Sequence, residues 1–149
     1  MTQKDKELLL KDLCARLPYG VNVHRTYIWG GEIKEDDGNI EINDLDSFIY
    51  ESVENLNKQG CTIKPYLRPM SSMTEEEGKE FNIITNGEKG FYEDEDGWVR
   101  CDNIHTKWGV WPKGCAEMID WLNEHHFDYR GLIEKGLALE APNGMYKTE

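Results

Sequence analysis

Apolar residues recur along this chain in short segments that follow two different periods, with turn residues between the segments. Leu9, Leu13 and Leu17 lie four residues apart, as on one face of a helix. From Val21 to Trp29, by contrast, apolar side chains alternate with other residues, as on one face of a strand. A sequence of 149 residues that mixes both periods favours an α+β domain, in which helices bury their apolar faces against a sheet.

Capping and stop signals predict the helices. The first begins after Thr2, a residue type that caps helices through its side-chain oxygen, and ends at Pro18, which cannot continue a helix. Thr74 and Glu77 have the spacing of a capping box and predict a short helix, which Gly78 limits to about two turns. Two further helices are expected, at Leu45–Lys58 and at Cys115–His126.

Turn dipeptides indicate that the sheet is built from hairpins. Asp37-Gly38, followed by Asn39, is a strong hairpin signal with isoleucines on both sides. Asn86-Gly87 and Asp96-Gly97 give the same signal. The stretch from Ile83 to Trp111 is therefore expected to form a small β-meander or an ordered loop.

The remaining strands are expected at Cys61–Leu67 and at Leu137–Leu139. Pro65 places the first of these at a sheet edge, because proline lacks the N–H that a central strand donates. We therefore predict one compact α+β domain over residues 1–149, with a small antiparallel sheet built from hairpins and three to four packed helices. A boundary between two subdomains is expected, if anywhere, within 75–96.

The net charge of −12 is unevenly distributed, because residues 75–96 carry nine acidic and only two basic residues. Such a chain is repelled by nucleic acid and by anionic lipid, so no direct nucleic-acid or membrane binding is expected. The run Glu93, Asp94, Glu95 and Asp96 is the candidate partner-binding site, for a basic protein surface. A solvated face that aids solubility is the alternative interpretation of this run.

The compartment is inferred from what the sequence lacks. Its apolar runs fall short of the roughly 18 residues that span a bilayer, and the first residues carry charges of both signs, unlike a signal peptide. We therefore expect a cytoplasmic protein. Its four cysteines, at 14, 61, 101 and 115, show no C-x-x-C spacing and are expected to be free thiols.

The sequence lacks residues that metal-binding and cofactor-binding motifs require. An EF-hand loop centred on Gly97 has Tyr92 at its first position and Asn103 at its last, where ligands are required. Zinc sites need two close pairs of ligands, whereas this sequence offers one mixed Cys–His pair and two adjacent histidines. No nucleotide-binding or nucleophile motif is present, so neither a metal nor a cofactor is predicted.

An enzyme remains the alternative. A hydrolase-like site requires a histidine or cysteine beside a carboxylate in a pocket, assembled from residues far apart in the sequence. The candidates are Cys101, Cys115, His24, His105, His125 and His126. A DNA-mimic inhibitor is a further alternative, and it requires carboxylates about 7 Å apart along one face, like the phosphates of DNA.

Three stretches are similar to segments of a known group of proteins. They are Leu13–Val21, Ile63–Thr74 and, with gaps, Asp120–Pro142. The group consists of short uncharacterised proteins encoded by Bacteroides-type gut bacteria and their phages or prophages. This resemblance implies a phage-linked accessory role and supplies no catalytic residue. With the charge pattern, it leads us to expect a non-enzymatic accessory or protein-interaction protein that uses an acidic and aromatic surface, of unknown partner and oligomeric state.

Overall fold

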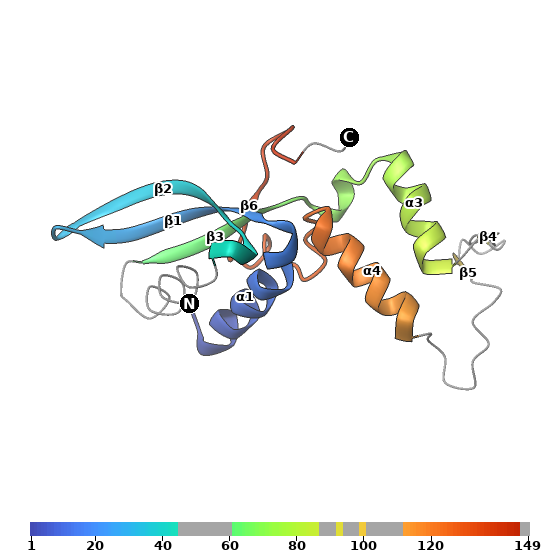
Figure 1. Ribbon diagram of the computed structural model, residues 1–149, viewed down its shortest axis with the longest axis horizontal. Helices are drawn as coiled ribbons and strands as arrows, with labels where there is room; N and C mark the ends of the chain where they lie inside the picture. The colour runs from blue at the N-terminus through green and yellow to red at the C-terminus, as the bar shows by residue number, and fades with distance from the viewer. Residues whose placement is uncertain (45–60, 87–91, 94–98, 101–111, 147–149) are drawn as a thin grey trace. The chain divides into compact units, whose positions relative to one another are not determined.

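The computed structural model describes residues 1–44, 61–86, 92–93, 99–100 and 112–146 (Figure 1). The helix predicted over Leu45–Lys58 lies outside these residues. The chain divides into two compact units. Residues 1–70 and 123–149 form unit 1, and residues 71–122 form unit 2.

Helix α1 (Gln3–Arg16) starts and stops where the sequence predicts. The Thr2 hydroxyl accepts from the Asp5 N–H at 3.2 Å, and the Asp5 carboxylate accepts in return from the Thr2 N–H at 2.8 Å. Pro18 then forces a short 3-10 turn, Leu17–Tyr19, in place of another helical turn. Leu9, Leu13 and Leu17 are buried, which confirms the predicted apolar face.

Strands β1 (Val21–Trp29) and β2 (Glu32–Ile40) form an antiparallel hairpin with nine consecutive residue pairs. The turn is at Gly30-Gly31, where both residues have left-handed φ angles of 62° and 85°. The turn predicted at Asp37-Gly38 is therefore wrong, and Gly38 lies inside β2 opposite Val23. Glycine leaves room there for the Arg25 side chain, because a Cβ atom would lie 3.1 Å from its Nη2 atom.

Strand β3 (Thr62–Leu67) pairs antiparallel with β1, and the short strand β6 (Leu139–Glu140) pairs parallel with β3. The sheet, with strand order β2-β1-β3-β6, is therefore mixed, and the prediction of a purely antiparallel sheet is wrong. The reason is that the long connection through unit 2 returns the chain to β3 in the same direction. The prediction that this strand lies at a sheet edge is wrong, because β3 has β1 and β6 as neighbours. Since β6 pairs only with Tyr66 and Leu67, Pro65 itself pairs with β1 alone.

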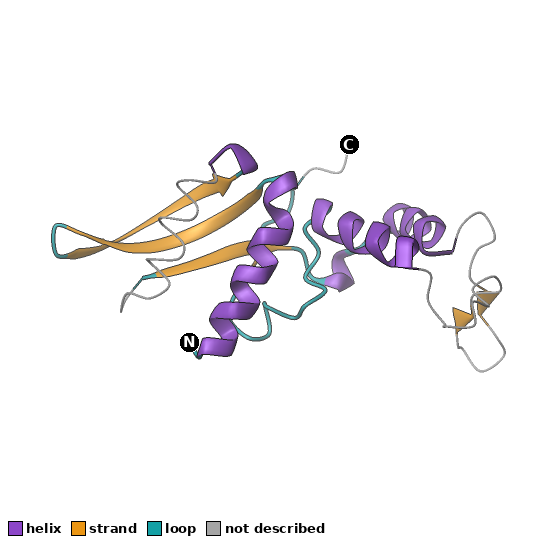
Figure 2. Ribbon diagram, turned by 60° about the horizontal axis from the view of Figure 1, so that its bottom comes forward, coloured by secondary structure: helices purple, strands orange, loops and turns teal. Residues whose placement is uncertain are grey.

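The core of unit 1 lies between α1 and one face of this sheet, and Figure 2 shows α1 lying across the strands. Side chains alternate along the strands, so Val21 and Val23 face α1 while Asn22 and His24 face the other way. We call the second face the polar face. The core side chains are Leu9, Leu13, Leu17, Val21, Val23, Ile40, Ile63, Leu67, Leu132, Leu137 and Ala138.

Unit 2 contains α3 (Glu75–Asn86), most of α4 (Pro112–Glu124) and the strands β4 (Tyr92–Glu93) and β5 (Val99–Arg100). The capping box is confirmed, since Thr74 N–H donates to the Glu77 carboxylate at 2.8 Å and Glu77 N–H donates to the Thr74 hydroxyl at 3.2 Å. With 12 residues, α3 is longer than the two turns predicted. The cost of Gly78, about 1 kcal/mol, is of the same size as the gain from such a cap, so the glycine does not end the helix.

The two short strands β4 and β5 pair antiparallel, Tyr92 with Arg100 and Glu93 with Val99. The turn predicted at Asp96-Gly97 lies between them and outside the described residues. In all, the part of the chain that the structure describes contains three α-helices and six strands. Two further 3-10 turns, Ile42–Asp44 and Met70–Ser72, connect them.

Candidate functional site

The end of the β1–β2 hairpin exposes three large apolar side chains. Trp29 is 73% exposed, Ile33 64% and Ile28 49%. Ile28 and Ile33 are directly opposite each other across the two strands and share the polar face of the sheet, while Trp29 is on the face that packs against α1. We call these three residues the hairpin tip. In Figure 1 the turn lies at the end of the hairpin farthest from α1, so this helix does not cover the tip.

The strands that carry the hairpin tip are held in place by polar contacts. Arg25 donates to both carboxylate oxygens of Asp36, at 2.8 and 3.0 Å, across the strand pair. The hydroxyls of Thr26 and Thr62 are 2.8 Å apart and connect β1 to β3. Bidentate arginine–carboxylate pairs fix geometry as well as add energy. The exposed tip is therefore supported by a regular, cross-linked sheet.

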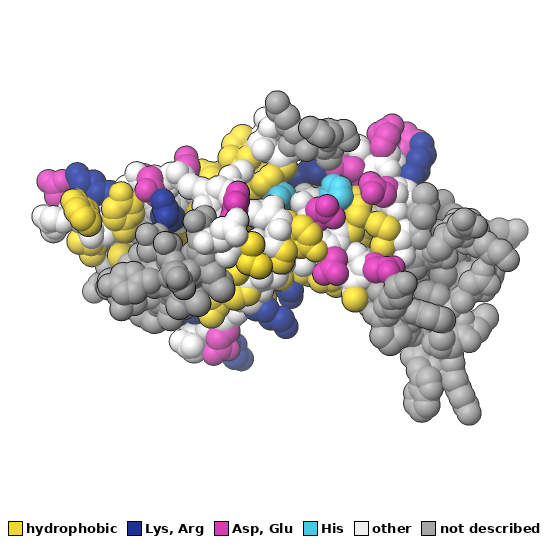
Figure 3. Space-filling model, in the orientation of Figure 1, with side chains coloured by type: hydrophobic (Ala, Val, Ile, Leu, Met, Phe, Trp, Pro, Cys, Tyr) yellow, Lys and Arg dark blue, Asp and Glu magenta, His cyan; other side chains and the backbone are white. Residues whose placement is uncertain are grey.

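Strand β2 is acidic. Four of its nine residues are carboxylates and one is lysine, and they are Glu32, Lys34, Glu35, Asp36 and Asp37. Alternation places Glu35 and Asp37 on the polar face, in line with Ile33. Figure 3 shows charged side chains beside the hydrophobic ones at this end of the hairpin. The hairpin thus combines an apolar tip with an acidic strand.

A histidine lies beside a carboxylate on the polar face. Nδ1 of His24 is 2.9 Å from Oδ1 of Asp37, and the Tyr66 hydroxyl donates to the same oxygen at 3.0 Å. Hydrogen bonds from His24 and from Tyr66 hold the pKa of Asp37 below its ordinary value. This is the pair of groups that the enzyme alternative requires, but it lies on an exposed sheet face.

Described residues of unit 1 line at least two hollows. One, of about 610 Å³, extends along the hairpin beside Tyr27, Trp29 and Lys34, and the other, of about 310 Å³, lies beside Asp5 and Lys135. None of the described residues that line either hollow is a histidine or a cysteine. The His24–Asp37 pair is therefore not placed in a described pocket, and the geometry does not support a hydrolytic site there.

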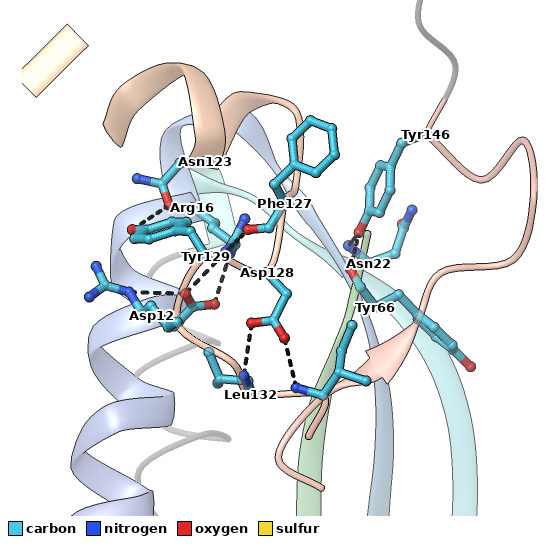
Figure 4. A network of polar contacts seen from close by, with 12 residues as sticks. Asp12, Arg16, Asn22, Tyr66, Asn123, Phe127, Asp128, Tyr129, Leu132 and Tyr146 are labelled. Carbon is cyan, nitrogen blue, oxygen red and sulfur yellow. Dashed lines mark hydrogen bonds and ion pairs between the residues drawn. The ribbon is translucent and has the colours of Figure 1, made fainter. Parts of the chain in front are cut away.

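A buried ionic network joins α1 to the segment after α4 (Figure 4). Arg16 is fully buried and donates to both oxygens of Asp12, at 2.8 and 3.1 Å, and to the backbone oxygen of Phe127 at 2.8 Å. Arg130 forms a second ion pair with Asp12 at 3.2 Å, and the Tyr129 ring lies near both arginines. The carboxylate that α1 buries thus has two cationic partners, which is what a buried charge requires.

Tyr146, the last described residue of the C-terminal segment, makes a second contact that sequence patterns do not reveal. The Tyr146 hydroxyl accepts from the backbone N–H of Asn22 at 3.1 Å and donates to the backbone oxygen of Tyr66 at 2.8 Å. Asn22 and Tyr66 are the next pair after Val23 and Pro65, so the hydroxyl continues the β1–β3 ladder by one position. Burial raises the pKa of Tyr146 to about 12.

His126 packs against Tyr146. The two rings are stacked with centroids 3.7 Å apart and planes inclined by 17°. His126 is only 6% exposed, and its buried Nδ1 atom has no hydrogen-bond partner among the described residues. Burial, with Arg16, His125 and Arg68 nearby, lowers the pKa of His126 from 6.5 to about 3. This histidine therefore belongs to the interior of unit 1, and it has an unusual left-handed φ of 58°.

The predicted acidic site is only partly described. Glu93 is in β4, and Asp94, Glu95 and Asp96 lie outside the described residues, so their role stays a prediction. Cys101 and His105 also lie outside, and Cys115 is in α4. Cys14 is exposed, Cys61 is buried, and both are free thiols.

Comparison of the chain with protein families, with curated proteins and with solved structures finds no significant match. Within the described ranges, no three or more His, Cys, Asp or Glu side chains gather as a metal site would require. The helices of the same residues are too short or too polar to cross a membrane.

Proposed function

We propose that this protein is a non-enzymatic protein-interaction module and that the hairpin tip is one of its contact surfaces. The observation that carries the proposal is the 73% exposure of Trp29 at the end of a regular hairpin, with Ile28 and Ile33 exposed beside it. Tryptophan is favoured at the energetic centres of protein interfaces. Large apolar side chains are exposed on both faces of this hairpin end, Ile28 and Ile33 on the polar face and Trp29 on the other, and such exposure marks an interaction site.

The free energy available from burial of the hairpin tip is limited. Complete burial of a large apolar side chain is worth about 1.5–3 kcal/mol. Burial of the three side chains at the hairpin tip therefore supplies several kcal/mol, against the roughly 4–15 kcal/mol that association costs in lost freedom. The tip alone does not give tight binding, so the partner must also use neighbouring groups. The acidic residues of β2 favour a basic partner for that purpose.

The acidic run Glu93–Asp96 also favours a basic partner, and it remains our candidate for a second contact. A phage-linked accessory role is part of the same proposal. The enzyme and DNA-mimic alternatives stay predictions from the sequence.

Site-specific photo-crosslinking in the full-length protein tests the proposal. A photoreactive amino acid replaces Trp29 in one variant and the exposed Lys11 of α1 in a matched control. We expect a defined adduct in bacterial lysate from position 29, not from position 11, and we expect excess unlabelled protein to compete it away. Competition should fail with the Trp29→Ser protein. Equal adducts from both positions, or competition that ignores Trp29→Ser, would show that the hairpin tip is not a contact surface.

A further inference from the structure

Strand β2 is at the edge of the sheet, and its outer side has no partner among the described strands. Edge strands of this length are usually protected by a bulge, a proline or a lysine, because their free N–H and C=O groups pair readily with another strand. The pairing of β2 with β1 runs through nine residues without a bulge, and β2 contains no proline. Its one lysine, Lys34, forms an ion pair with Glu32 at 2.6 Å. Its residues from Glu32 to Glu35 are all exposed.

The hydrogen-bonding pattern identifies which backbone groups of β2 point outward. The Asn22 N–H bonds to the Tyr146 hydroxyl on the β3 side, so the even-numbered residues of β1 face β3 and the odd-numbered ones face β2. Their partners in β2, which include Lys34 and Asp36, therefore bond inward. The residues whose N–H and C=O groups point out of the sheet are Ile33, Glu35, Asp37 and Asn39.

The side chains of the same residues define what an added strand must carry. Ile33, Glu35 and Asp37 lie on the polar face at intervals of about 7 Å, two residues of strand. On an added strand, the side chains directly opposite lie about 4.5–5.5 Å away, near enough to pair by charge. The complement is an extended segment with an apolar residue opposite Ile33 and lysine or arginine opposite Glu35 and Asp37.

The same charges disfavour a second copy of this chain. Pairing two β2 edges brings together strands that each carry four carboxylates and one lysine, and like charges opposite each other are destabilising. An acidic edge therefore blocks self-association and accepts a basic strand, so that charge provides both the attraction and the selectivity.

We infer that β2 receives an added strand from a protein partner, a basic extended segment that pairs with the outward-facing backbone groups of Ile33, Glu35, Asp37 and Asn39. The inference rests on the proposed function, because it names the partner's chemistry for the same hairpin. Backbone hydrogen bonds give such a complex its affinity, and the alternating side chains give its specificity. Occupation of the edge also brings the partner next to Ile33 of the hairpin tip.

Amide hydrogen exchange of the full-length protein, read by NMR with a synthetic probe, tests the inference. The probe is a short peptide with a valine and then lysines at alternate positions and threonines between them, added at millimolar concentration. We expect slower exchange at Ile33, Glu35, Asp37 and Asn39, and no change at Lys34 and Asp36, whose amides already bond to β1. Absence of protection, or protection without this alternation, would overturn the inference. Protection that grows with protein concentration and without peptide would identify a second copy as the occupant, and would overturn it too.

Matched probes and variants separate backbone pairing from charge attraction. The same peptide with N-methyl groups on its bonding amides should lose the protection, and so should a peptide with glutamate for lysine. Glu35→Pro removes one outward N–H without removing a bond to β1, and should weaken binding about fivefold or more. Glu35→Gln should weaken it about twofold to fivefold, and Glu32→Gln, the same change on the opposite face, should weaken it less.

The outcomes distinguish this inference from the proposed function. A specific crosslink from position 29 without alternating protection of β2 leaves the hairpin tip as a contact surface and refutes strand addition. If N-methylated and unmodified peptides bind equally, the attraction is electrostatic only, and strand addition is again refuted. If both experiments fail, the hairpin has neither role.

Discussion

We expect the His126→Asn substitution to make the free energy of unfolding of unit 1 less sensitive to acid. The ring is 6% exposed, stacked on Tyr146, and near Arg16, His125 and Arg68, all of which disfavour its charged form. Its pKa of about 3 in the folded protein compares with 6.5 for a free histidine. Between these two values the unfolded chain binds a proton that the folded chain does not.

The sign and size of the effect follow from that difference. Because the folded-state pKa is the lower one, the free energy of unfolding is unaffected above pH 6.5 and decreases as the pH falls from 6.5 towards 3. The slope is about 1.4 kcal/mol per pH unit, so between pH 7 and pH 5 this histidine removes about 2 kcal/mol of stability. Asparagine is the matched substitution, because it tolerates the left-handed φ of 58° and does not titrate.

The assay is chemical denaturation of both proteins at pH 7 and pH 5. Loss of the ring stack lowers the stability of the His126→Asn variant by the same amount at both pH values. Other titrating groups contribute equally in the two proteins. Both contributions therefore cancel when the loss of stability between pH 7 and pH 5 is compared between the wild-type protein and the variant. We expect the wild-type protein to lose about 2 kcal/mol more than the variant between the two pH values. Equal losses, within about 0.5 kcal/mol, would refute the assignment of His126 as a buried neutral base.

Three further substitutions test the contacts that hold unit 1 together. Tyr146→Phe removes the hydroxyl that bridges β1 and β3 and should lower the free energy of unfolding by about 1–3 kcal/mol, because two backbone groups lose their partner; denaturation with urea measures it. Arg16→Met leaves the buried Asp12 carboxylate with Arg130 alone and should cost about 3–5 kcal/mol, whereas the double variant Arg16→Met, Asp12→Leu should recover part of the loss. Gly38→Ala should cost less than about 1 kcal/mol by thermal denaturation, because the atom that its Cβ meets is the mobile end of an arginine side chain.

Local signals in the sequence predicted the elements well where the stabilising contacts are themselves local. The Thr2 cap, the stop at Pro18 and the Thr74–Glu77 capping box each depend on residues within four positions. The prediction of the hairpin turn was wrong because glycine serves two different purposes in this hairpin. Gly30-Gly31 supplies the left-handed turn, whereas Gly38 makes room for an arginine side chain of the neighbouring strand.

Contacts between distant residues were not predictable in this way. Arg16 bonds to a backbone oxygen 111 positions away, and the Tyr146 hydroxyl bonds to an amide 124 positions away. Alternation in β1 correctly grouped Val21, Val23 and Trp29 on one face, but a period does not tell how far a helix extends over that face. Helix α1 covers the two valines and leaves Trp29 exposed, so the candidate contact surface emerges only from the structure.

The bridge between Arg68 and Phe127 has a consequence for the order in which the chain folds during synthesis. These two residues pair at the points where the chain leaves unit 1 and returns to it, so residues 71–122 are an insertion between neighbouring positions. The core of unit 1 needs Leu132, Leu137 and Ala138 and therefore stays incomplete until the ribosome has translated the whole insertion. Until then the edge of β3 that pairs with β6 is unpaired and the core lacks these three side chains, a situation in which chaperones commonly act. Since the entropy of closing a loop grows only with the logarithm of its length, the same arrangement allows the insertion to vary in length at little cost to unit 1.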